Sequence, residues 1–306
     1  MNDPGHLTTP EWLLYRLLNR LLGMLGRIPP SIAKKSGDLL GDMGFVLDKR
    51  HRNITLDNIA LALGGELNAQ QQVALARAVY RNLGQIIFEV GWWMTARPET
   101  LNQIIHIDGL EYFQAASERG KGMLFVTAHI GNWELLPYIG SYLQMPVNIV
   151  YRPLDFKPLN LVFERSRSRF GAKLIPSRHA LLRILKALKK GEAVAMLMDQ
   201  NVDYYDGVWV DFFGHPACTS KSMAVIAMKT GASVLPVFLY RQATGFRATI
   251  GGIIPPSSTG DQTKDIEANT ARYTQAIEQA IRQSPDQWFW VHRRWKTKNY
   301  SPWPKQ

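Results

Sequence analysis

The sequence predicts an α/β domain in which a mixed sheet is flanked by helices, with a helical region in front of it. From residue 106 onward, short apolar runs rich in Val, Ile and Phe alternate with longer segments of helical periodicity. Residues 31–96 show helical periodicity without strand-like runs. Alternating strands and helices are typical of an α/β sheet domain, so we place the boundary near Arg97 and Pro98.

The first predicted element is a basic amphipathic helix over residues 12–27. Arg16, Arg20 and Arg27 recur at helical spacing on one face, and a tryptophan and several leucines cover most of the rest. This pattern favours a helix that lies in the plane of an anionic membrane surface, and the alternative is an ordinary N-terminal helix packed on the core. The segment falls short of the roughly 18 uncharged apolar residues expected of a spanning helix.

The remaining predicted elements follow from apolar periodicity and its interruptions. Helices are predicted over residues 33–47, 70–93, 132–143, 159–170, 178–190, 220–230 and 265–284. Strands are predicted over residues 124–128, 147–151, 193–198, 234–240, 247–254 and 288–292. We therefore divide the chain into a membrane-associating helix (1–30), a helical region packed on the core (31–104), the α/β domain (105–298) and a tail (299–306).

Composition narrows the functional classes. The chain has 306 residues, 46% of them hydrophobic, which suffices for one large or two small domains. The formal charge of +11 points to an anionic partner: nucleic acid, an acidic protein or a membrane surface. Cys218 is the only cysteine, so a disulfide framework and a cysteine-based metal site are excluded. Motifs for nucleotide binding, serine hydrolysis and zinc proteases are absent from the sequence.

His129 and Glu134 are the first candidate catalytic pair. His129 directly follows a buried strand, and Asn132 is a plausible N-cap of the next helix. Residues five apart cannot share a helix face, but a loop between strand and helix could fold the two side chains together. A carboxylate on one imidazole nitrogen would leave the other nitrogen as a base for a substrate hydroxyl. The plainer alternative is a histidine satisfied by backbone and a glutamate that favours a first helical turn.

Three further groups carry chemistry. Arg165 and Arg169 share a predicted helix face and could grip a phosphate, although an arginine run is more often a solvated face. Asp199 ends an apolar strand, where it could hold an arginine, orient a substrate hydroxyl or form a plain turn. The aromatic and basic block over residues 288–296 could stack bases or sit at a membrane interface; without a nucleic-acid-binding motif, the sequence favours the interface.

These groups belong to an ordered series of motifs. Along the chain run His-x₄-Glu, Tyr-Arg-Pro, Arg-x-Arg-Ser-Arg-Phe-Gly, Lys-Lys-Gly-Glu with an apolar run and Asp-Gln, Phe-Phe-Gly with a following Thr, Gly-Ala-x with apolar residues and Pro, and Trp-x-His-Arg-Arg-Trp-Lys-Thr. Over residues 105–298 this order resembles the lipid A late acyltransferases, which belong to the glycerolipid acyltransferase superfamily. The helical N-terminal third is compatible with that resemblance.

The resemblance implies an enzyme on the cytoplasmic face of the Gram-negative inner membrane. It would move a fatty acyl group from acyl carrier protein to a hydroxyl of an anionic glycolipid, a lipid A precursor, with the membrane surface as a further partner. It implies no metal, no cofactor besides the thioester donor and no nucleic acid.

The resemblance also assigns site residues. It makes His129 the general base and Glu134 its partner. Arg165 and Asp199 match block positions tied to activity in such enzymes, and Arg167 lies one step away in the same run of arginines. Arg152, in the Tyr-Arg-Pro block, is a candidate ligand contact.

Several alternatives stay open. The same pair could activate water in a thioesterase, or the acceptor could be another lipid glycoside. The chain could also be a non-catalytic binder of membranes or nucleic acid. A covalent route through Cys218 lacks an evident base in the sequence. Lys186, Lys189 and Lys190 are candidates for the surface that meets the carrier protein.

Overall fold

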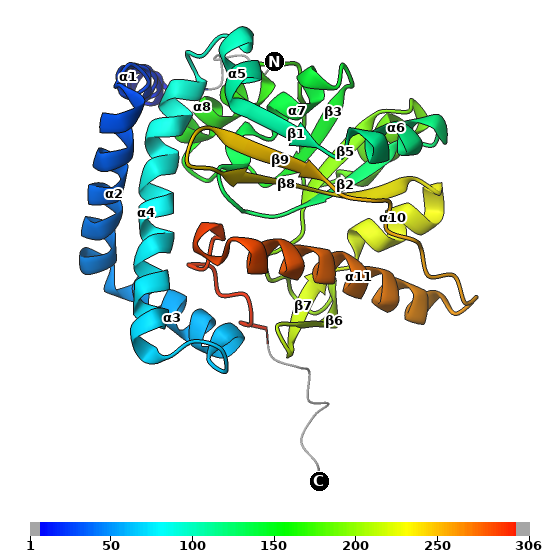
Figure 1. Cartoon of the computed structure of the whole chain (residues 1–306). Coiled ribbons are helices and arrows are strands. Elements are labelled where there is room, and N and C mark those ends of the chain that lie inside the picture. The colour runs from blue at the N-terminus through cyan, green and yellow to red at the C-terminus, as the bar shows by residue number, and fades with distance from the viewer. Residues whose placement is uncertain (1–6, 298–306) are drawn as a thin grey trace.

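A seven-stranded mixed sheet forms the centre of the protein (Figure 1). The computed structural model describes residues 7–297, so the predicted tail over 299–306 lies outside the described residues. The strand order is β1-β9-β8-β2-β5-β3-β4, and every neighbouring pair is parallel except β8 and β9. The strands are β1 (Ile105–Asp108), β2 (Met123–Thr127), β3 (Val147–Tyr151), β4 (Lys173–Pro176), β5 (Ala193–Leu197), β8 (Ser233–Arg241) and β9 (Phe246–Ile250). A separate antiparallel hairpin consists of β6 (Gly207–Phe212) and β7 (His215–Ser220).

Helices cover both faces of this sheet, which explains why its central strands are apolar along their whole length. On one side lie α6 (Leu110–Glu118), α7 (Pro137–Tyr142) and α8 (Lys157–Ser168). On the other lie α9 (Leu181–Lys189), α10 (Ser222–Thr230) and α11 (Gln262–Gln283). Alternate residues of β2 point into two separate hydrophobic clusters, with Leu124 and Val126 in one and Met123 and Phe125 in the other.

The helical region packs against this domain through several of its helices. It comprises α1 (Thr9–Leu25), α2 (Pro30–Leu47), α3 (Lys49–Leu63), α4 (Ala69–Trp93) and the short α5 (Pro98–Ile104). α2 packs along α4, and α1 contacts both α4 and α8. The α2–α4 contact is close because Gly37 and Gly41 of α2 face Gly84 of α4. The basic run after Leu47 belongs to the start of α3, where the side chain of Asp48 accepts the amide of His51.

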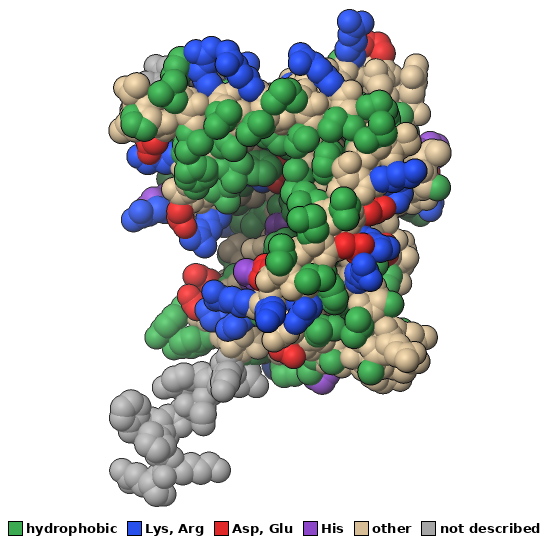
Figure 2. Space-filling model, turned by 90° about the vertical axis from the view of Figure 1, so that its left-hand side faces the viewer, with side chains coloured by type: hydrophobic (Ala, Val, Ile, Leu, Met, Phe, Trp, Pro, Cys, Tyr) green, Lys and Arg blue, Asp and Glu red, His purple; other side chains and the backbone are tan. Residues whose placement is uncertain are grey.

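Many apolar side chains of the first two helices face solvent. On α1 these are Trp12, Leu13, Leu14, Leu17, Leu21 and Met24, and on α2 they are Ile32, Leu39, Leu40, Met43, Val46 and Leu47. Figure 2 shows hydrophobic side chains gathered on this side of the molecule, with Lys and Arg along its upper edge. Within residues 7–297, none of the helices combines the length and the apolar character needed to cross a membrane.

The structure corrects three sequence predictions. Residues 288–292 form no strand: Trp288 makes a single bridge to Ile130, and Trp288 and Trp290 are buried, so the interface expected for these two tryptophans is wrong. The helix expected over 132–143 is two pieces, η2 (Trp133–Leu135) and α7, because Pro137 starts a new helix. The strands β1, β4, β6 and β7 were not predicted; the two edge strands of the sheet are only four residues long and partly exposed.

The α2–α4 contact yields a test of the fold. A methyl group added in Gly84→Ala would overlap the carbonyl oxygen of Gly37, so we expect a loss of about 1–3 kcal/mol of stability from overpacking. Gly23→Ala in α1 is the matched control, because the added methyl group meets no atom within 4 Å and alanine favours a helix interior by about 0.5–1 kcal/mol. Thermal melting in detergent should show a lower melting temperature for the first variant only. Equal melting temperatures would contradict the close packing of the two helices.

Candidate active site

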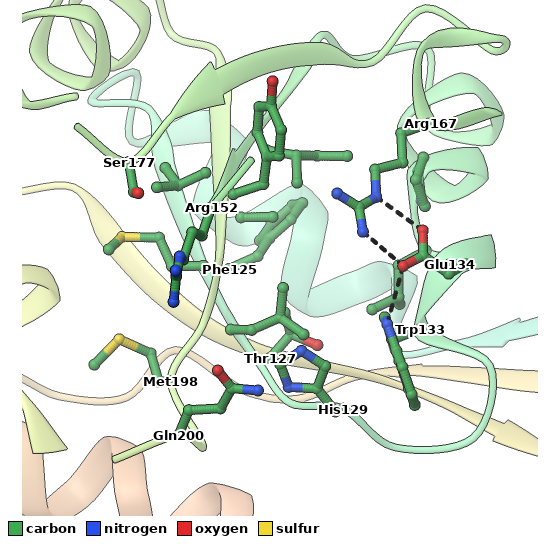
Figure 3. A pocket seen from close by; sticks show the side chains of 18 of the residues that line it. Phe125, Thr127, His129, Trp133, Glu134, Arg152, Arg167, Ser177, Met198 and Gln200 are labelled. Carbon is green, nitrogen blue, oxygen red and sulfur yellow. Dashed lines mark hydrogen bonds and ion pairs between the residues drawn. The ribbon is translucent and has the colours of Figure 1, made fainter. Parts of the chain in front are cut away.

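A cavity of about 620 Å³ opens at the carboxyl ends of β2, β3 and β5 (Figure 3). Its floor is apolar, and its polar wall carries four of the six predicted site residues: His129, Glu134, Arg152 and Arg167. Asp199 lies directly behind His129, outside the cavity lining. Ligands bind at this edge of open α/β sheets because polar loop groups gather where the apolar strands end.

The carboxylate that holds His129 is Asp199, which corrects the expected pairing with Glu134. His129 Nδ1 lies 2.9 Å from Asp199 Oδ1, and the backbone amide of His129 donates to Asp199 Oδ2 at 2.9 Å. Because an ionised carboxylate only accepts hydrogen bonds, Nδ1 must carry the proton. In the neutral form of this ring, which lines the cavity, Nε2 is then the nitrogen without a proton, and it can serve as a base.

Asp199 is an ionised group buried beneath the cavity. Its side chain is 2% exposed, and burial by itself would raise its pKa. The positive charge of His129 in its imidazolium form and the hydrogen bonds from His129 and Trp288 outweigh burial and lower the pKa of Asp199 to about 2. The indole N–H of Trp288 donates to Asp199 Oδ2 at 2.8 Å. A fixed negative charge at this place can stabilise an imidazolium ion while it forms on His129.

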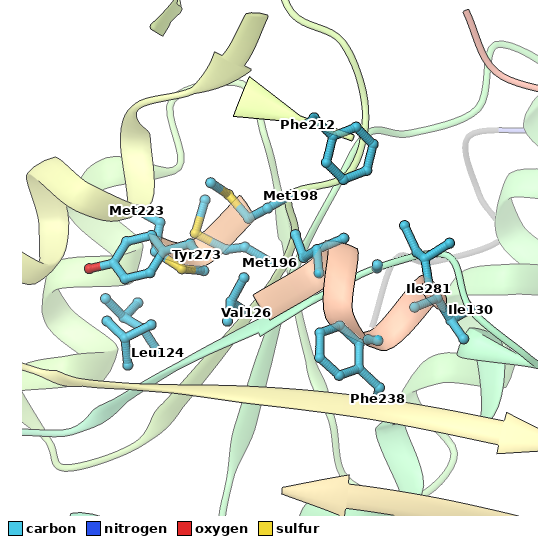
Figure 4. Close-up of a cluster of buried hydrophobic side chains, with 14 of the residues drawn as sticks. Leu124, Val126, Ile130, Met196, Met198, Phe212, Met223, Phe238, Tyr273 and Ile281 are labelled. Carbon is cyan, nitrogen blue, oxygen red and sulfur yellow. The ribbon is translucent and has the colours of Figure 1, made fainter. Parts of the chain in front are cut away.

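The C-terminal segment holds the loop that carries His129. The amide of Phe289 donates to the carbonyl of His129, and the amide of Gly131 donates to the carbonyl of Gln287, both at 3.0 Å. Gly131 has a φ of 58°, and a Cβ there would overlap the carbonyl oxygen of Leu239. Ile130 points the other way, into the hydrophobic cluster that contains Ile281 and Phe238 (Figure 4).

Aromatic rings fix the orientation of the imidazole. The ring centroid of His129 lies 5.0 Å from that of Trp133, in an edge-on arrangement, and 5.8 Å from that of Phe289. These two rings contact His129, Trp288 contacts Asp199, and the sequence analysis did not assign any of the three to the site. The signal that could have found two of them is the tryptophan-rich block itself, since large aromatic residues are as typical of a buried core as of an interface.

Glu134 pairs with Arg167 on the opposite wall from Arg152 and Ser177 (Figure 3). Arg167 Nη2 and Nε donate to the two carboxylate oxygens at 2.6 and 2.8 Å, and Trp133 Nε1 adds a bond of 3.1 Å. Burial would lower the pKa of Arg167, but the charge of Glu134 raises it, so the guanidinium stays charged. Such a bidentate pair fixes the plane of the guanidinium.

The three alternating arginines of this segment separate in the structure. Arg165 lies outside the cavity, where its Nη1 donates to the hydroxyl of Tyr15 on α1 at 2.9 Å. Arg169 donates to the backbone carbonyls of Trp93 and Ala96. The phosphate grip considered as an alternative for Arg165 and Arg169 is therefore not formed, and of these three arginines Arg167 lines the cavity.

The remaining predicted residues occupy the rim or the core. Arg152 lies at the rim of the cavity, with its side chain 82% exposed. Its Nη2 is 3.7 Å from Oδ2 of Asp155. Cys218 is fully buried in β7 and does not line the cavity, and burial raises the pKa of its thiol. In the part of the chain from residue 7 to 297, no three His, Cys, Asp or Glu side chains gather as a metal site would require.

Comparisons with known proteins agree on one family. A sequence model of the family described as bacterial lipid A biosynthesis acyltransferase matches residues 3–297. The chain is 28% identical to the lipid A biosynthesis palmitoleoyltransferase of Escherichia coli K12, over 94% of this chain and 92% of the relative. It is 26% identical to the lipid A biosynthesis lauroyltransferase of the same organism, over 95% and 94%.

A more distant relative acts on another lipid. The phosphatidylinositol mannoside acyltransferase of Mycobacterium tuberculosis is 24% identical over 62% of this chain and 59% of the relative. The family match, by contrast, covers all the described residues, including every residue that lines the cavity. The chain belongs to the bacterial lipid A biosynthesis acyltransferase family.

Proposed function

We propose that this protein transfers a fatty acyl chain from acyl carrier protein to a hydroxyl of a lipid A precursor, a secondary acylation of lipopolysaccharide biosynthesis. The observation that carries the proposal is the His129–Asp199 pair at the mouth of a large cavity with an apolar floor. The pair supplies a base for a hydroxyl, and the floor suits a hydrocarbon chain. The names of the two Escherichia coli relatives, a palmitoleoyltransferase and a lauroyltransferase, support this reaction class.

The proposed chemistry needs no covalent acyl-enzyme. Nε2 of His129 removes the proton from the acceptor hydroxyl as its oxygen attacks the thioester carbonyl carbon. Asp199 stabilises the imidazolium that results. The tetrahedral intermediate collapses and the carbon–sulfur bond breaks. Nε2 then donates its proton to the departing thiolate. The products are the ester and the free thiol of the carrier.

Arg167 is the proposed donor to the oxyanion. It uses two N–H groups on Glu134, and a guanidinium has five, so further donors remain. Figure 3 shows one of its nitrogens directed toward the cavity. One such donor is typically worth about 3 kcal/mol in the transition state. Glu134 is then a positioning residue for Arg167, and Arg152 at the rim remains a candidate contact for an anionic group of a substrate.

Side chains on one face of the sheet line the proposed acyl site. Phe125 of β2, Ile149 of β3 and Ala195 of β5 lie in one row of the parallel register and line the cavity. Ala195 is the smallest of the three, so it leaves space between its neighbours for a chain. Burial of each methylene of that chain would contribute about 0.8 kcal/mol.

We propose that α1 and α2 rest on the cytoplasmic face of the inner membrane. Their twelve exposed apolar side chains and the exposed Arg16 and Arg20 support this arrangement, because anionic head groups attract arginines. A second candidate acceptor is a mannosylated phospholipid, supported by the mycobacterial relative. Hydrolysis of the thioester by water is the remaining alternative.

The decisive test is acyl transfer in detergent. We expect the purified protein, given lauroyl or palmitoleoyl carrier protein and a tetra-acylated lipid A precursor, to add one acyl chain by mass spectrometry. His129→Ala should lower the rate by about 1000-fold, because the base is lost. Free fatty acid without acylated product would indicate a thioesterase, and transfer only to a mannosylated phospholipid would indicate the second acceptor.

Removing the charge of Asp199 should affect both activity and stability. We expect Asp199→Asn to lower kcat by about 1000-fold or more, because the amide favours the wrong imidazole tautomer. The folded-state pKa of Asp199, about 2, lies below its ordinary value of 3.8, so its ionised form stabilises the fold above that value and the contribution is lost as pH falls toward 2. The melting temperatures of wild type and variant should therefore converge as the pH falls from about 5 to about 2. A constant difference would show that the charge is not the cause.

Two neighbouring arginines provide a matched comparison. Arg167→Ala should lower kcat by about 100-fold, because it removes the proposed oxyanion donor and leaves Glu134 without its cation. Arg165→Ala, two residues away on the same helix, should change kcat by less than about threefold, since Arg165 does not line the cavity and donates to Tyr15 on α1. Steady-state kinetics with the carrier-linked donor measures both. Similar losses in the two variants would rule out a specific role for Arg167.

A further inference from the structure

An exposed leucine surrounded by cations stands on α9. Leu182 is 79% exposed, the largest value among the exposed large hydrophobic side chains of the described residues. Around it lie four exposed cations, which with Leu182 we name the α9 face: Arg178, Arg183, Lys186 and Lys189. Leu182 and Lys186 are one helical turn apart and are therefore neighbours on the helix surface. Among residues 7–297, none of these four cations forms an ion pair. The α9 face therefore offers uncompensated positive charge around one apolar group.

The α9 face adjoins the mouth of the cavity. Ser177, next to Arg178, lines the cavity, and its amide donates to the carbonyl of Tyr151 at 2.8 Å. Figure 3 places Ser177 on the same side of the cavity as the rim residue Arg152. A molecule seated on the α9 face can thus reach the cavity with a flexible arm.

We propose that the α9 face is the docking surface for the acidic carrier protein, with Leu182 as its apolar anchor; this inference rests on the proposed function. An acidic partner is attracted by the four cations and is oriented before contact. A central apolar side chain surrounded by charged groups is the usual arrangement of an interface anchor. From that position the acyl thioester on its arm enters beside Arg152 and reaches His129.

A protein partner fits the α9 face better than a lipid surface does. α9 packs with α10 and β5, in the layer that also contains α11. The exposed apolar side chains of α1 and α2 lie on another part of the fold, since α1 packs on α4 and α8. α9 exposes only Leu181 and Leu182 beside its cations, against twelve large apolar side chains on α1 and α2. Its surface is therefore dominated by charge, as a contact with an acidic protein requires.

The test compares two donors that carry the same acyl chain. Leu182→Asp and Lys186→Glu in the full-length protein should each lower kcat/KM for lauroyl carrier protein by about tenfold. For lauroyl-pantetheine, which has the arm without the protein, kcat/KM should stay within about twofold. Lys264→Glu on α11 reverses an exposed charge outside the α9 face and should leave both values unchanged. Added salt should reduce the wild-type preference for the carrier-linked donor.

Each other outcome overturns the inference. Equal losses with both donors would mean that the substitutions damage the cavity. Unchanged kinetics with the carrier-linked donor would mean that the carrier docks elsewhere. Loss of binding to phosphatidylglycerol vesicles, with both donors unaffected, would make the α9 face a lipid contact. If the wild type transfers the chain from neither donor, the proposed function itself fails, and that result is distinct from the other three.

Discussion

The site depends on one buried negative charge, the carboxylate of Asp199. A carboxylate removed from water is tolerated only where hydrogen-bond donors and a cation replace its hydration. Three donors do so: the backbone amide of His129, its ring nitrogen Nδ1, and the indole of Trp288. They come from the end of β2 and from the segment after α11. Satisfying this one charge therefore determines where distant parts of the chain meet, and it sets the tautomer of the imidazole.

The parallel pairing of β2 and β5 brings together the two groups of the proposed catalytic pair. Thr127 lies opposite Leu197 in the register, so two residues further on His129 is level with Asp199, although the two are 70 positions apart in sequence. Both strands are covered on both faces and carry only apolar or small side chains until they end. Polar side chains follow at the point where the strands and their hydrogen-bond pairing end, which is why the cavity opens at this edge.

The local apolar pattern of the sequence predicted most strands of the central sheet, but it predicted less of how the site residues pair. β3 matches its predicted bounds, and β2, β5 and β8 differ by a residue or so at each end, because buried parallel strands have a strong apolar signal. His129 and Asp199 were both singled out from their positions at strand ends, but their pairing was not, since the strand order that makes β2 and β5 neighbours is a long-range property. For the same reason the block around Trp288 was assigned to an interface. Its partner, a carboxylate 89 positions earlier, is invisible to periodicity.

Three alternating arginines at the C-terminal end of α8 contact three different parts of the molecule. Arg167 points into the cavity and holds Glu134, while Arg165 reaches Tyr15 on α1 and Arg169 binds carbonyls at and beyond the end of α4. A helical step of 100° sends residues two apart to nearly opposite sides, so Arg167 faces the cavity while Arg165 faces α1. The lysine at the start of α8, Lys157, adds an ion pair of 3.7 Å to Glu11 of α1. The helix that carries the proposed oxyanion donor is therefore also the one on which α1 is seated.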